Sequence, residues 1–332
     1  MAEEVLWERD LHQRGSGSAL AVADGCVVVH ERWTRLVCLD LSDGSVRWDV
    51  PFGLWPRAVA VTGDRCFGIA QNIDALTCWD VRSGAVLWNL PLSRFTGYIT
   101  ATEDTVLIGG WRGYTDLTAL DSETGRLRWS RSGRPATVRP FAHCGGVLIG
   151  APGSSEMSLL DVHDGSERGH WTLPEPLWSA DHARIFALGG PGRVLVQSGR
   201  RTVVELRLGT DEIRTLARHD SDLTPAGARL VGGLLWLTDA KGGTAYDAAD
   251  GHLLWRVDIG QWLAPGIVPA GPELLIGGDQ GTLLRLDHDG RTVRRTSVSR
   301  RIAGVHAAGP VEAPDVALVV TRGTLMAIRI GE

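Results

Sequence analysis

The sequence predicts an all-β fold, an eight-bladed β-propeller built from four-stranded antiparallel blades. Three observations lead to this prediction. A short motif recurs every 40 to 44 residues, each repeat contains four short apolar runs, and the two ends of the chain supply complementary parts of one repeat. A fixed period of this size is the signature of a repeat architecture. The acidic residues that mark the motif are Asp40, Asp80, Asp121, Asp161, Glu205, Asp247 and Asp287.

Four strands are expected in each repeat. In the second repeat they are AVAV, CFGIA, ALTCWDV and AVLWNL, which begin at residues 58, 66, 75 and 85. Such runs are rich in apolar and β-branched residues and are separated by Gly, Asp and Asn, as strands and turns are. The third repeat divides in the same way, and no long stretch has the 3.6-residue period of an amphipathic helix.

The chain ends predict how the ring closes. The segment GTLMAIR at 323–329 matches GTLLRLD at 281–287, so an eighth repeat begins near the C-terminus but lacks its last strand. The segment EEVLW at 3–7 aligns with GSVRW at 44–48. We therefore expect residues 3–9 to complete the last blade, which leaves no free sheet edge at the seam. Residues 1–332 are interpreted as a single propeller domain, and we expect it to be a monomer.

The motif itself, ALDSETGRLRW at 119–129, fits the turn between the third and fourth strands of a blade. The Asp can accept hydrogen bonds from turn amides, and the Gly can adopt positive φ. The Trp falls on the outermost strand, where its ring can cover the joint with the next blade. Six tryptophans have this place: Trp7, Trp48, Trp88, Trp129, Trp171 and Trp255.

This motif resembles the tryptophan-docking motif of the PQQ-like eight-bladed propellers. That superfamily includes quinoprotein alcohol dehydrogenases and BamB-type scaffold proteins, and the resemblance covers the whole chain. WD40 propellers are the competing interpretation, because CWDVRSG at 78–84 is similar to part of a WD40 repeat. WD40 repeats do not place a Trp on the fourth strand, and the Gly-His pairs of this chain lie elsewhere, so the PQQ-like family is preferred.

The resemblance does not extend to the cofactor chemistry of the dehydrogenases. The sequence has no adjacent cysteine pair, no C-x-x-C-H haem motif and none of the large insertions of those enzymes. We expect no cofactor, and in particular no PQQ-dependent dehydrogenase activity. Cys26 and Cys66 occupy one repeat position, and Cys38 and Cys78 occupy another, the place of Ala119 in the motif, where a small buried thiol fits. The five cysteines include no C-x-x-C spacing, so we expect reduced thiols and no metal site.

Composition excludes several function classes. The formal net charge of −5 argues against a general nucleic-acid binder. No run of 18 apolar residues exists, so no membrane span is expected. The acidic start MAEEVLWERD does not resemble a signal peptide, in contrast to the exported BamB-type lipoproteins, and a cytoplasmic location is expected. Lys241 is the only lysine, which indicates a GC-rich bacterial genome.

The remaining tryptophans indicate a candidate site. Trp79 and Trp236 fall inside strands and are expected in the core. The other five all fall in the second-to-third-strand turns or in the loops between blades, which share one face. Arg and Tyr residues accompany them, a combination typical of interface hot spots and suited to anionic ligands. The candidate binding residues are Trp33, Trp55, Arg57, Trp111, Tyr114, Arg139, Trp178, Trp262, Arg301 and His306.

Two functions follow from this face. The first is a non-catalytic scaffold that captures a protein or peptide partner. The alternative is a cofactor-independent enzyme that holds an aromatic or anionic small molecule at the funnel mouth, as in a step of a bacterial biosynthetic pathway. No catalytic grouping stands out in the sequence, which favours the scaffold. Packing between blades would account for about half of the loop aromatics without any function.

Overall fold

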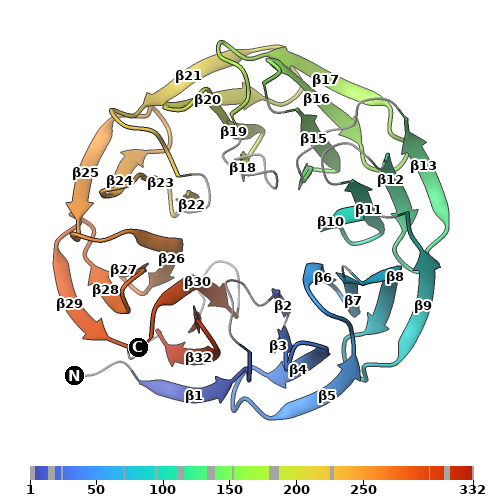
Figure 1. Cartoon of the computed structure of the whole chain (residues 1–332). Coiled ribbons are helices and arrows are strands. Elements are labelled where there is room, and N and C mark those ends of the chain that lie inside the picture. Colours follow the sequence, from blue (N-terminus) through green and yellow to red (C-terminus); the bar gives the residue numbers. More distant parts are fainter. Residues whose placement is uncertain are drawn as a thin grey trace.

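The computed structural model describes residues 4–13, 19–23, 25–70, 72–93, 96–110, 116–132, 139–151, 153–178, 187–224, 228–298, 300–309 and 315–330. Within this part, 32 strands form eight four-stranded antiparallel sheets arranged in a ring, and no helix is present (Figure 1). The predicted eight-bladed propeller is confirmed. None of the described segments is a helix with the length and hydropathy of a membrane span.

Each blade is one sheet of sequential strands, from the ring axis outward. Blades 1 to 4 consist of β2 (Leu20–Ala23), β3 (Cys26–Glu31), β4 (Arg35–Asp40) and β5 (Val46–Pro51); β6 (Pro56–Thr62), β7 (Arg65–Ala70), β8 (Ile73–Asp80) and β9 (Val86–Pro91); β10 (Thr96–Ala101), β11 (Thr105–Gly110), β12 (Leu117–Asp121) and β13 (Leu127–Arg131); and β14 (Phe141–His143), β15 (Gly146–Gly150), β16 (Glu156–Asp161) and β17 (Glu167–Thr172).

Blades 5 to 8 continue the ring. They consist of β18 (Ala187–Gly190), β19 (Arg193–Ser198), β20 (Thr202–Arg207) and β21 (Ile213–Arg218); β22 (Arg229–Val231), β23 (Leu234–Thr238), β24 (Gly242–Asp247) and β25 (Leu253–Asp258); β26 (Leu263–Ala270), β27 (Glu273–Gly278), β28 (Thr282–Leu286) and β29 (Thr292–Ser297); and β30 (Ile302–Ala308), β31 (Val316–Thr321), β32 (Thr324–Arg329) and β1 (Val5–Asp10).

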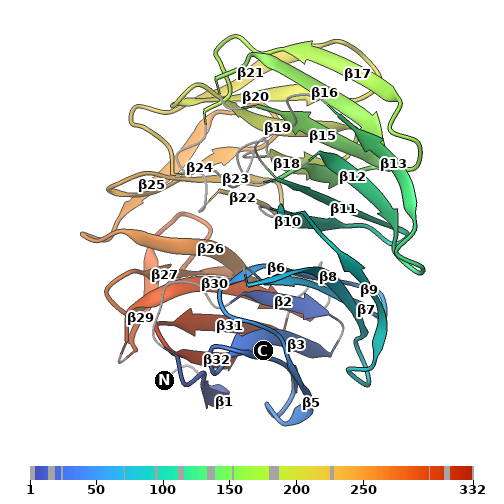
Figure 2. The same cartoon turned by 45° about the vertical axis from the view of Figure 1, so that its right-hand side comes forward.

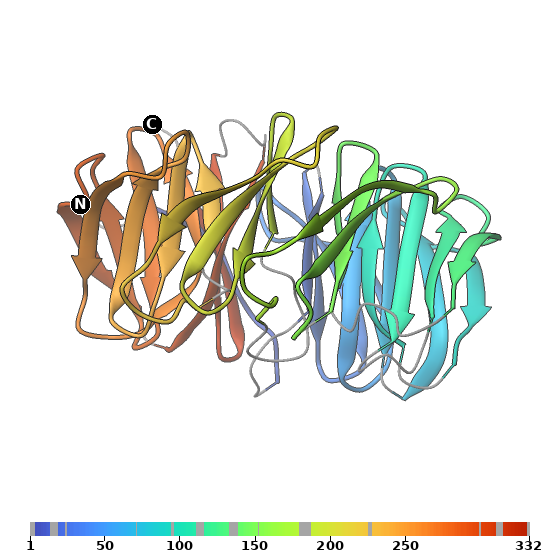
Figure 3. The ribbon, with the colours of Figure 1, turned by 90° about the horizontal axis from the view of Figure 1, so that it is seen from above.

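The strand order divides the connections between two faces of a flattened ring (Figure 3). The turns that join the first to the second strand and the third to the fourth strand of a blade lie on one face. The turns that join the second to the third strand, and the loops from each blade to the next, lie on the other. We call this second face the loop face.

The N-terminal strand closes the ring. β1 pairs antiparallel with β32, from Val5 opposite Ile328 to Asp10 opposite Thr324, and the two strands lie side by side (Figure 2). The prediction that the N-terminal strand completes the last blade is confirmed, and the described strand spans Val5–Asp10. On its other side, Arg9 makes two hydrogen bonds of 2.6 and 2.9 Å with the carboxylate of Glu31 in blade 1, whose side chain is 1% exposed. The closing strand is therefore fastened to both neighbouring sheets.

The hydrophobic core lies between the blades. The described residues form eight buried clusters, and each cluster combines side chains of two adjacent blades. Trp79 and Trp236 are buried in two of these clusters, as predicted. Cys26, Cys38, Cys66 and Cys78 are buried free thiols in the same layer, whereas Cys144 is exposed. A blade has no complete core of its own, which makes closure of the ring important for stability.

The outer-strand tryptophans connect consecutive blades. Five indole N–H groups donate to a backbone carbonyl 33 or 34 residues later, in the next blade, over 2.7 to 3.1 Å. The indole ring also packs over the turn glycine of the next blade. For example, a Cβ added to Gly84, whose φ is +72°, would lie 2.8 Å from the Trp48 ring. Glycine is thus required here both for positive φ and for the close approach of the ring.

Trp171 departs from this arrangement. Its ring is buried between blades 4 and 5, but its indole N–H has no hydrogen-bond partner among the described residues. Two extra residues precede it in the motif, so it lies six residues after Gly165 instead of four. Its packing is retained while the hydrogen bond to the next blade is lost.

Every outer strand carries a β-bulge, which the sequence did not predict. In blade 1, Cys38 pairs with Trp48 and Leu39 with Val46, so Arg47 has no opposite residue. All eight outer strands show a register shift against their third strand. Bulges increase the local twist and disrupt the edge of a sheet, which protects exposed edge strands from pairing with another chain.

Candidate functional site

The predicted tryptophans lie on the loop face wherever the structure describes them. Trp33 is in the turn between β3 and β4, and the other three lie in loops between blades: Trp55 before β6, Trp178 before β18 and Trp262 before β26. The exposed fractions of Trp33, Trp55 and Trp262 are 45%, 57% and 54%, and Trp178 is partly buried. Trp111 and Tyr114 lie outside the described residues.

The remaining predicted residues have different settings. Arg57 is the second residue of β6, and Arg139 precedes β14 and donates from Nε to the hydroxyl of Thr100 over 3.3 Å. His306 lies within the innermost strand β30 and not in a loop. The candidates therefore do not converge on one centre. They are distributed around the ring, and the structure gathers some of them into two separate pockets.

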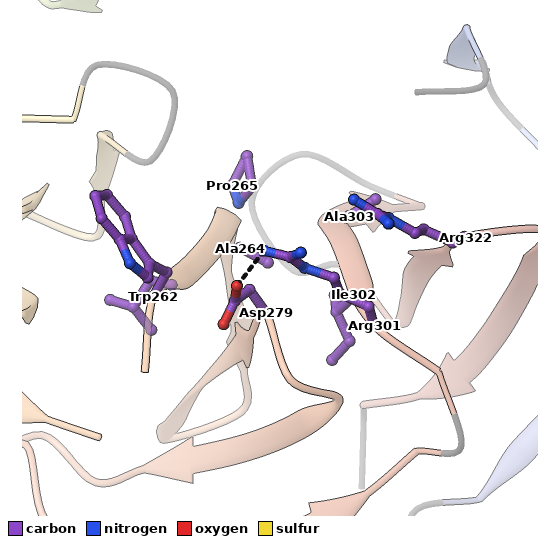
Figure 4. Close-up of a pocket in the computed structure, with 9 residues that line it drawn as sticks. Trp262, Ala264, Pro265, Asp279, Arg301, Ile302, Ala303 and Arg322 are labelled. Atoms are coloured by element: carbon purple, nitrogen blue, oxygen red, sulfur yellow. Dashed lines mark hydrogen bonds and ion pairs between the residues drawn. The ribbon is translucent and has the colours of Figure 1, made fainter. Parts of the chain in front are cut away.

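The first pocket lies between blades 7 and 8, has a volume of about 500 Å³, and brings two predicted residues together (Figure 4). Trp262 and Arg301 line it, with Asp279 between them. Arg301 forms an ion pair with Oδ2 of Asp279. Ala264, Pro265, Ile302 and Ala303 supply apolar surface, and Arg322 completes the lining.

Backbone hydrogen bonds position these side chains. The N–H of Asp279, in the turn between β27 and β28, donates to the carbonyl of Trp262 over 2.7 Å. The N–H of Arg322, in the turn between β31 and β32, donates to the carbonyl of Arg301 over 3.2 Å. Each hydrogen bond connects an inter-blade loop to the second-to-third-strand turn of the following blade. The loops that line the pocket are therefore held by the ends of the strands.

The second pocket lies at blade 5 and has a volume of about 940 Å³. The guanidinium of Arg200 lies 5.4 Å from the ring centroid of Trp178, within the range of a cation–π contact. Asp222 accepts from both Arg200 and Arg201, over 3.0 and 2.8 Å. Arg218 and Glu175 also line this pocket. Trp178 and two of the arginines are thus already engaged within the chain.

A buried histidine, His30, contacts both segments that carry Trp33 and Trp55. Both tryptophans have positive φ, 65° and 53°, which is rare for a residue with a large side chain. Nε2 of His30 lies 3.0 Å from the carbonyl oxygens of Trp33 and of Gly53, so the proton must be on this nitrogen to donate to either. Burial lowers the pKa of His30 from its ordinary value, so the ring is neutral at pH 7. His30 thereby links the β3–β4 turn that carries Trp33 to the loop before β6 that carries Trp55.

His219, which lies in the loop that enters blade 6, is buried, at 3% exposure. Its Nδ1 lies 2.8 Å from the Tyr246 hydroxyl and its Nε2 lies 3.0 Å from Oδ2 of Asp239. The other carboxylate oxygen of Asp239 accepts the N–H groups of Lys241 and Gly242 over 2.7 and 3.0 Å. This network connects the loop entering blade 6 to a turn of that blade. Because Tyr246 is also buried, we assign the network a structural role.

Among the described residues, one group has metal-ligand geometry: Asp247, Asp250 and His252, with ligand atoms within 4.8 Å of one another. They belong to a third-to-fourth-strand turn, which is on the face opposite the loop face. Asp247 and Asp250 already accept N–H groups from Ala249 and His252, as turn aspartates do. We therefore interpret these three residues as part of a hydrogen-bonded turn and not as a metal site.

Sequence reasoning missed Arg322 as a member of the first pocket. Arg322 lies in a second-to-third-strand turn, the position used to select Trp33 and Trp111. Sorting the arginines by the same rule would have found it. The pairing of Trp262 with Arg301 follows from their positions in the two loops that flank blade 7.

Comparison with known proteins places these features in context. The sequence model of the family described as outer membrane protein assembly factor BamB matches residues 2–72, 54–244 and 244–330. A comparison with curated proteins found no significant match.

Solved structures with the same fold have little sequence identity with this chain. Saccharomyces cerevisiae Sqt1 is 10% identical, with a TM-score of 0.76 and 100% of both chains covered. The computationally designed Ika8 protein is 15% identical, with a TM-score of 0.73, covering 97% of this chain and 100% of that one. A europium-containing methanol dehydrogenase is 12% identical, with a TM-score of 0.69, covering 95% and 84%. At these identities the likeness concerns the fold alone.

Proposed function

Since this chain belongs to the family of the outer membrane protein assembly factor BamB, we propose that it is a non-catalytic binding scaffold that captures a protein partner on its loop face. The family is described as an outer membrane protein assembly factor. A propeller suits this role because its loops can vary on a rigid ring.

One observation carries the proposal. Trp33, Trp55 and Trp262 expose about half of their surface on the loop face, whereas Trp79 and Trp236 in the strands are buried. Exposed tryptophan is costly in water, and Trp and Arg are the residue types most enriched at the centres of interfaces. The strained backbone at Trp33 and Trp55 supports the same conclusion, because such strain costs about 1–3 kcal/mol and concentrates at functional sites.

Site-specific photo-crosslinking tests the proposal. A benzophenone amino acid is placed at Trp33, Trp55 or Trp262 in the full-length chain, and, as a control, at the exposed Arg82 and Glu123 on the opposite face. The protein is expressed and irradiated in its source organism. We expect one recurring crosslinked protein from the loop-face positions and none from the controls. Equal crosslinking from both faces would contradict the proposal, and a crosslinked small molecule in place of a protein would favour the enzyme alternative.

A further inference from the structure

The pocket of Trp262, Asp279, Arg301 and Arg322 carries a more specific inference, which rests on the proposed binding function of the loop face. The charged side chains that line this pocket do not balance one another. Among the described residues that line the pocket, Arg301 and Arg322 each carry a guanidinium group, and Asp279 carries the one carboxylate (Figure 4). Arg301 is held by Asp279, whereas the side chain of Arg322 makes no ion pair or hydrogen bond with any residue that the structure describes. The pocket therefore offers a positive charge on a chain whose formal net charge is −5.

The pocket also has a polar atom that needs a donor. Oδ2 of Asp279 pairs with Arg301, but Oδ1 is buried and has no hydrogen-bond partner among the described residues. A buried carboxylate oxygen without a donor is unfavourable. Because Oδ1 is inaccessible to solvent, an N–H group from an occupant satisfies it once the side chains around it move on binding.

The third feature is apolar. The Trp262 ring, 54% exposed, stands at one side of the pocket beside Ala264 and Pro265, with Ile302 and Ala303 near Arg301. One pocket of about 500 Å³ thus offers an occupant three contacts: Arg322 for an anion, Asp279 for an N–H group and Trp262 for an apolar group. A peptide supplies all three within two residues, through an acidic side chain, its backbone amide and an apolar neighbour.

We propose that the pocket between blades 7 and 8 recognises an acidic segment of the partner protein, with an Asp or Glu carboxylate on Arg322 and Arg301, a backbone N–H on Asp279 and an adjacent large apolar side chain against Trp262. Attraction between this pocket and an acidic segment is local, since the formal net charge of the whole chain is −5. This combination gives specificity for a carboxylate that comes with an apolar neighbour, and it disfavours polyanions such as nucleic acids.

The probe for the test is a phage-displayed library of random dodecapeptides, selected on the full-length wild-type protein. Enriched sequences are synthesised with a fluorescent label, and their affinity is measured by anisotropy. We expect the enriched peptides to carry an Asp or Glu beside a large apolar residue. Arg322→Ala and Trp262→Ala should each weaken binding by about ten-fold or more, as truncation of an interface anchor does. The matched control is Arg300→Ala, an exposed neighbour that does not line the pocket, and it should change affinity by less than about two-fold.

A charge exchange makes the test independent of folding. Arg322→Glu should abolish binding of the acidic peptide and restore binding of the same peptide with its acidic residue changed to Lys. No enrichment of acidic peptides, or binding that is insensitive to Arg322, overturns the proposal. If indole-3-acetate competes as strongly as the peptide, the pocket is a small-molecule site and the peptide proposal also falls.

The two proposals can fail separately. If the loop face crosslinks to a partner whose affinity does not depend on Arg322, the scaffold function stands and the pocket assignment is wrong. If acidic peptides bind through Arg322 but no protein crosslinks to the loop face, the pocket assignment stands and the scaffold function is wrong.

Discussion

Replacing Trp7 with alanine should destabilise the whole propeller, although the residue lies near the N-terminus. Trp7 is 8% exposed, its ring belongs to the cluster between blades 8 and 1, and its indole N–H donates to the carbonyl of Leu41 over 2.8 Å. Removing a buried Trp side chain costs about 3–5 kcal/mol. Within that range, the lost indole hydrogen bond contributes about 1 kcal/mol.

The assay is urea unfolding at equilibrium, followed by tryptophan fluorescence and circular dichroism. Trp7→Phe retains an aromatic ring and loses the N–H donor, so it should cost about 1 kcal/mol plus a small packing term. Trp262→Ala is the control, because an exposed ring outside the core should change the free energy of unfolding by less than about 0.5 kcal/mol. We also expect Trp7→Ala to aggregate during unfolding, since release of β1 exposes the edge of β32.

The reasoning is refuted if Trp7→Ala and Trp262→Ala have the same stability. It is also refuted if a protein without residues 1–9 remains a monomer with the unfolding midpoint of the wild type. Either result would mean that blade 8 is stable without its outer strand and that closure does not hold the ring.

Three further predictions follow from other parts of the structure. Gly84→Ala should lower the free energy of urea unfolding by about 2 kcal/mol or more, because a Cβ at φ +72° meets the Trp48 ring at 2.8 Å. The control is Gly63→Ala, where φ is +53° and the Cβ has open space, so only the conformational cost of about 1–2 kcal/mol is expected. Equal costs for the two variants would show that the contact with the Trp48 ring is unimportant. Hydrogen bonds from Ser42 and Arg47 lower the pKa of Asp40, and those from Arg128 and Thr124 lower the pKa of Asp121, to about 2 in each case. Because the pKa in an unfolded chain is about 3.9, the stability from these carboxylates is present above pH 4 and is lost as the pH falls towards 2; Asp121→Asn should reduce this pH dependence, and an unchanged slope would count against it. Incubation with PQQ and Ca²⁺ should give no dye-linked alcohol oxidation above a heat-inactivated control, and clear turnover would show that the cofactor prediction is wrong.

The architecture could be predicted because its determinants are local and periodic. Asp121, Gly125 and Trp129 specify a turn and an outer strand within nine residues, and the repetition of this unit gives the blade count. The closing strand followed from the same alignment, since Trp7 stands one period before Trp48. Topology then assigned each loop to a face without any coordinates.

The details of the candidate site could not be predicted in this way, because they depend on contacts between distant segments. His30 and His219 lie near loops in the sequence. Only the fold shows that both are buried, His30 beside backbone carbonyl groups and His219 beside the carboxylate of Asp239. The bulge before each outer-strand Trp leaves no signature in the hydrophobic pattern. Which loop residues share a pocket depends on the blades they flank: Trp262 and Arg301 meet across blade 7, whereas Trp33 and Trp55 lie at the joint of blades 1 and 2.

The most direct test of the loop face as the working surface uses the partner identified by crosslinking. Its affinity for the wild type, Trp55→Ala and Trp262→Ala is measured by titration calorimetry, together with the urea unfolding of each variant. We predict that one or both substitutions weaken the affinity by about ten-fold or more while the free energy of unfolding stays within about 0.5 kcal/mol of the wild type. Variants that unfold much earlier would show that these rings pack the structure, and variants that bind and unfold like the wild type would show that the working surface lies elsewhere.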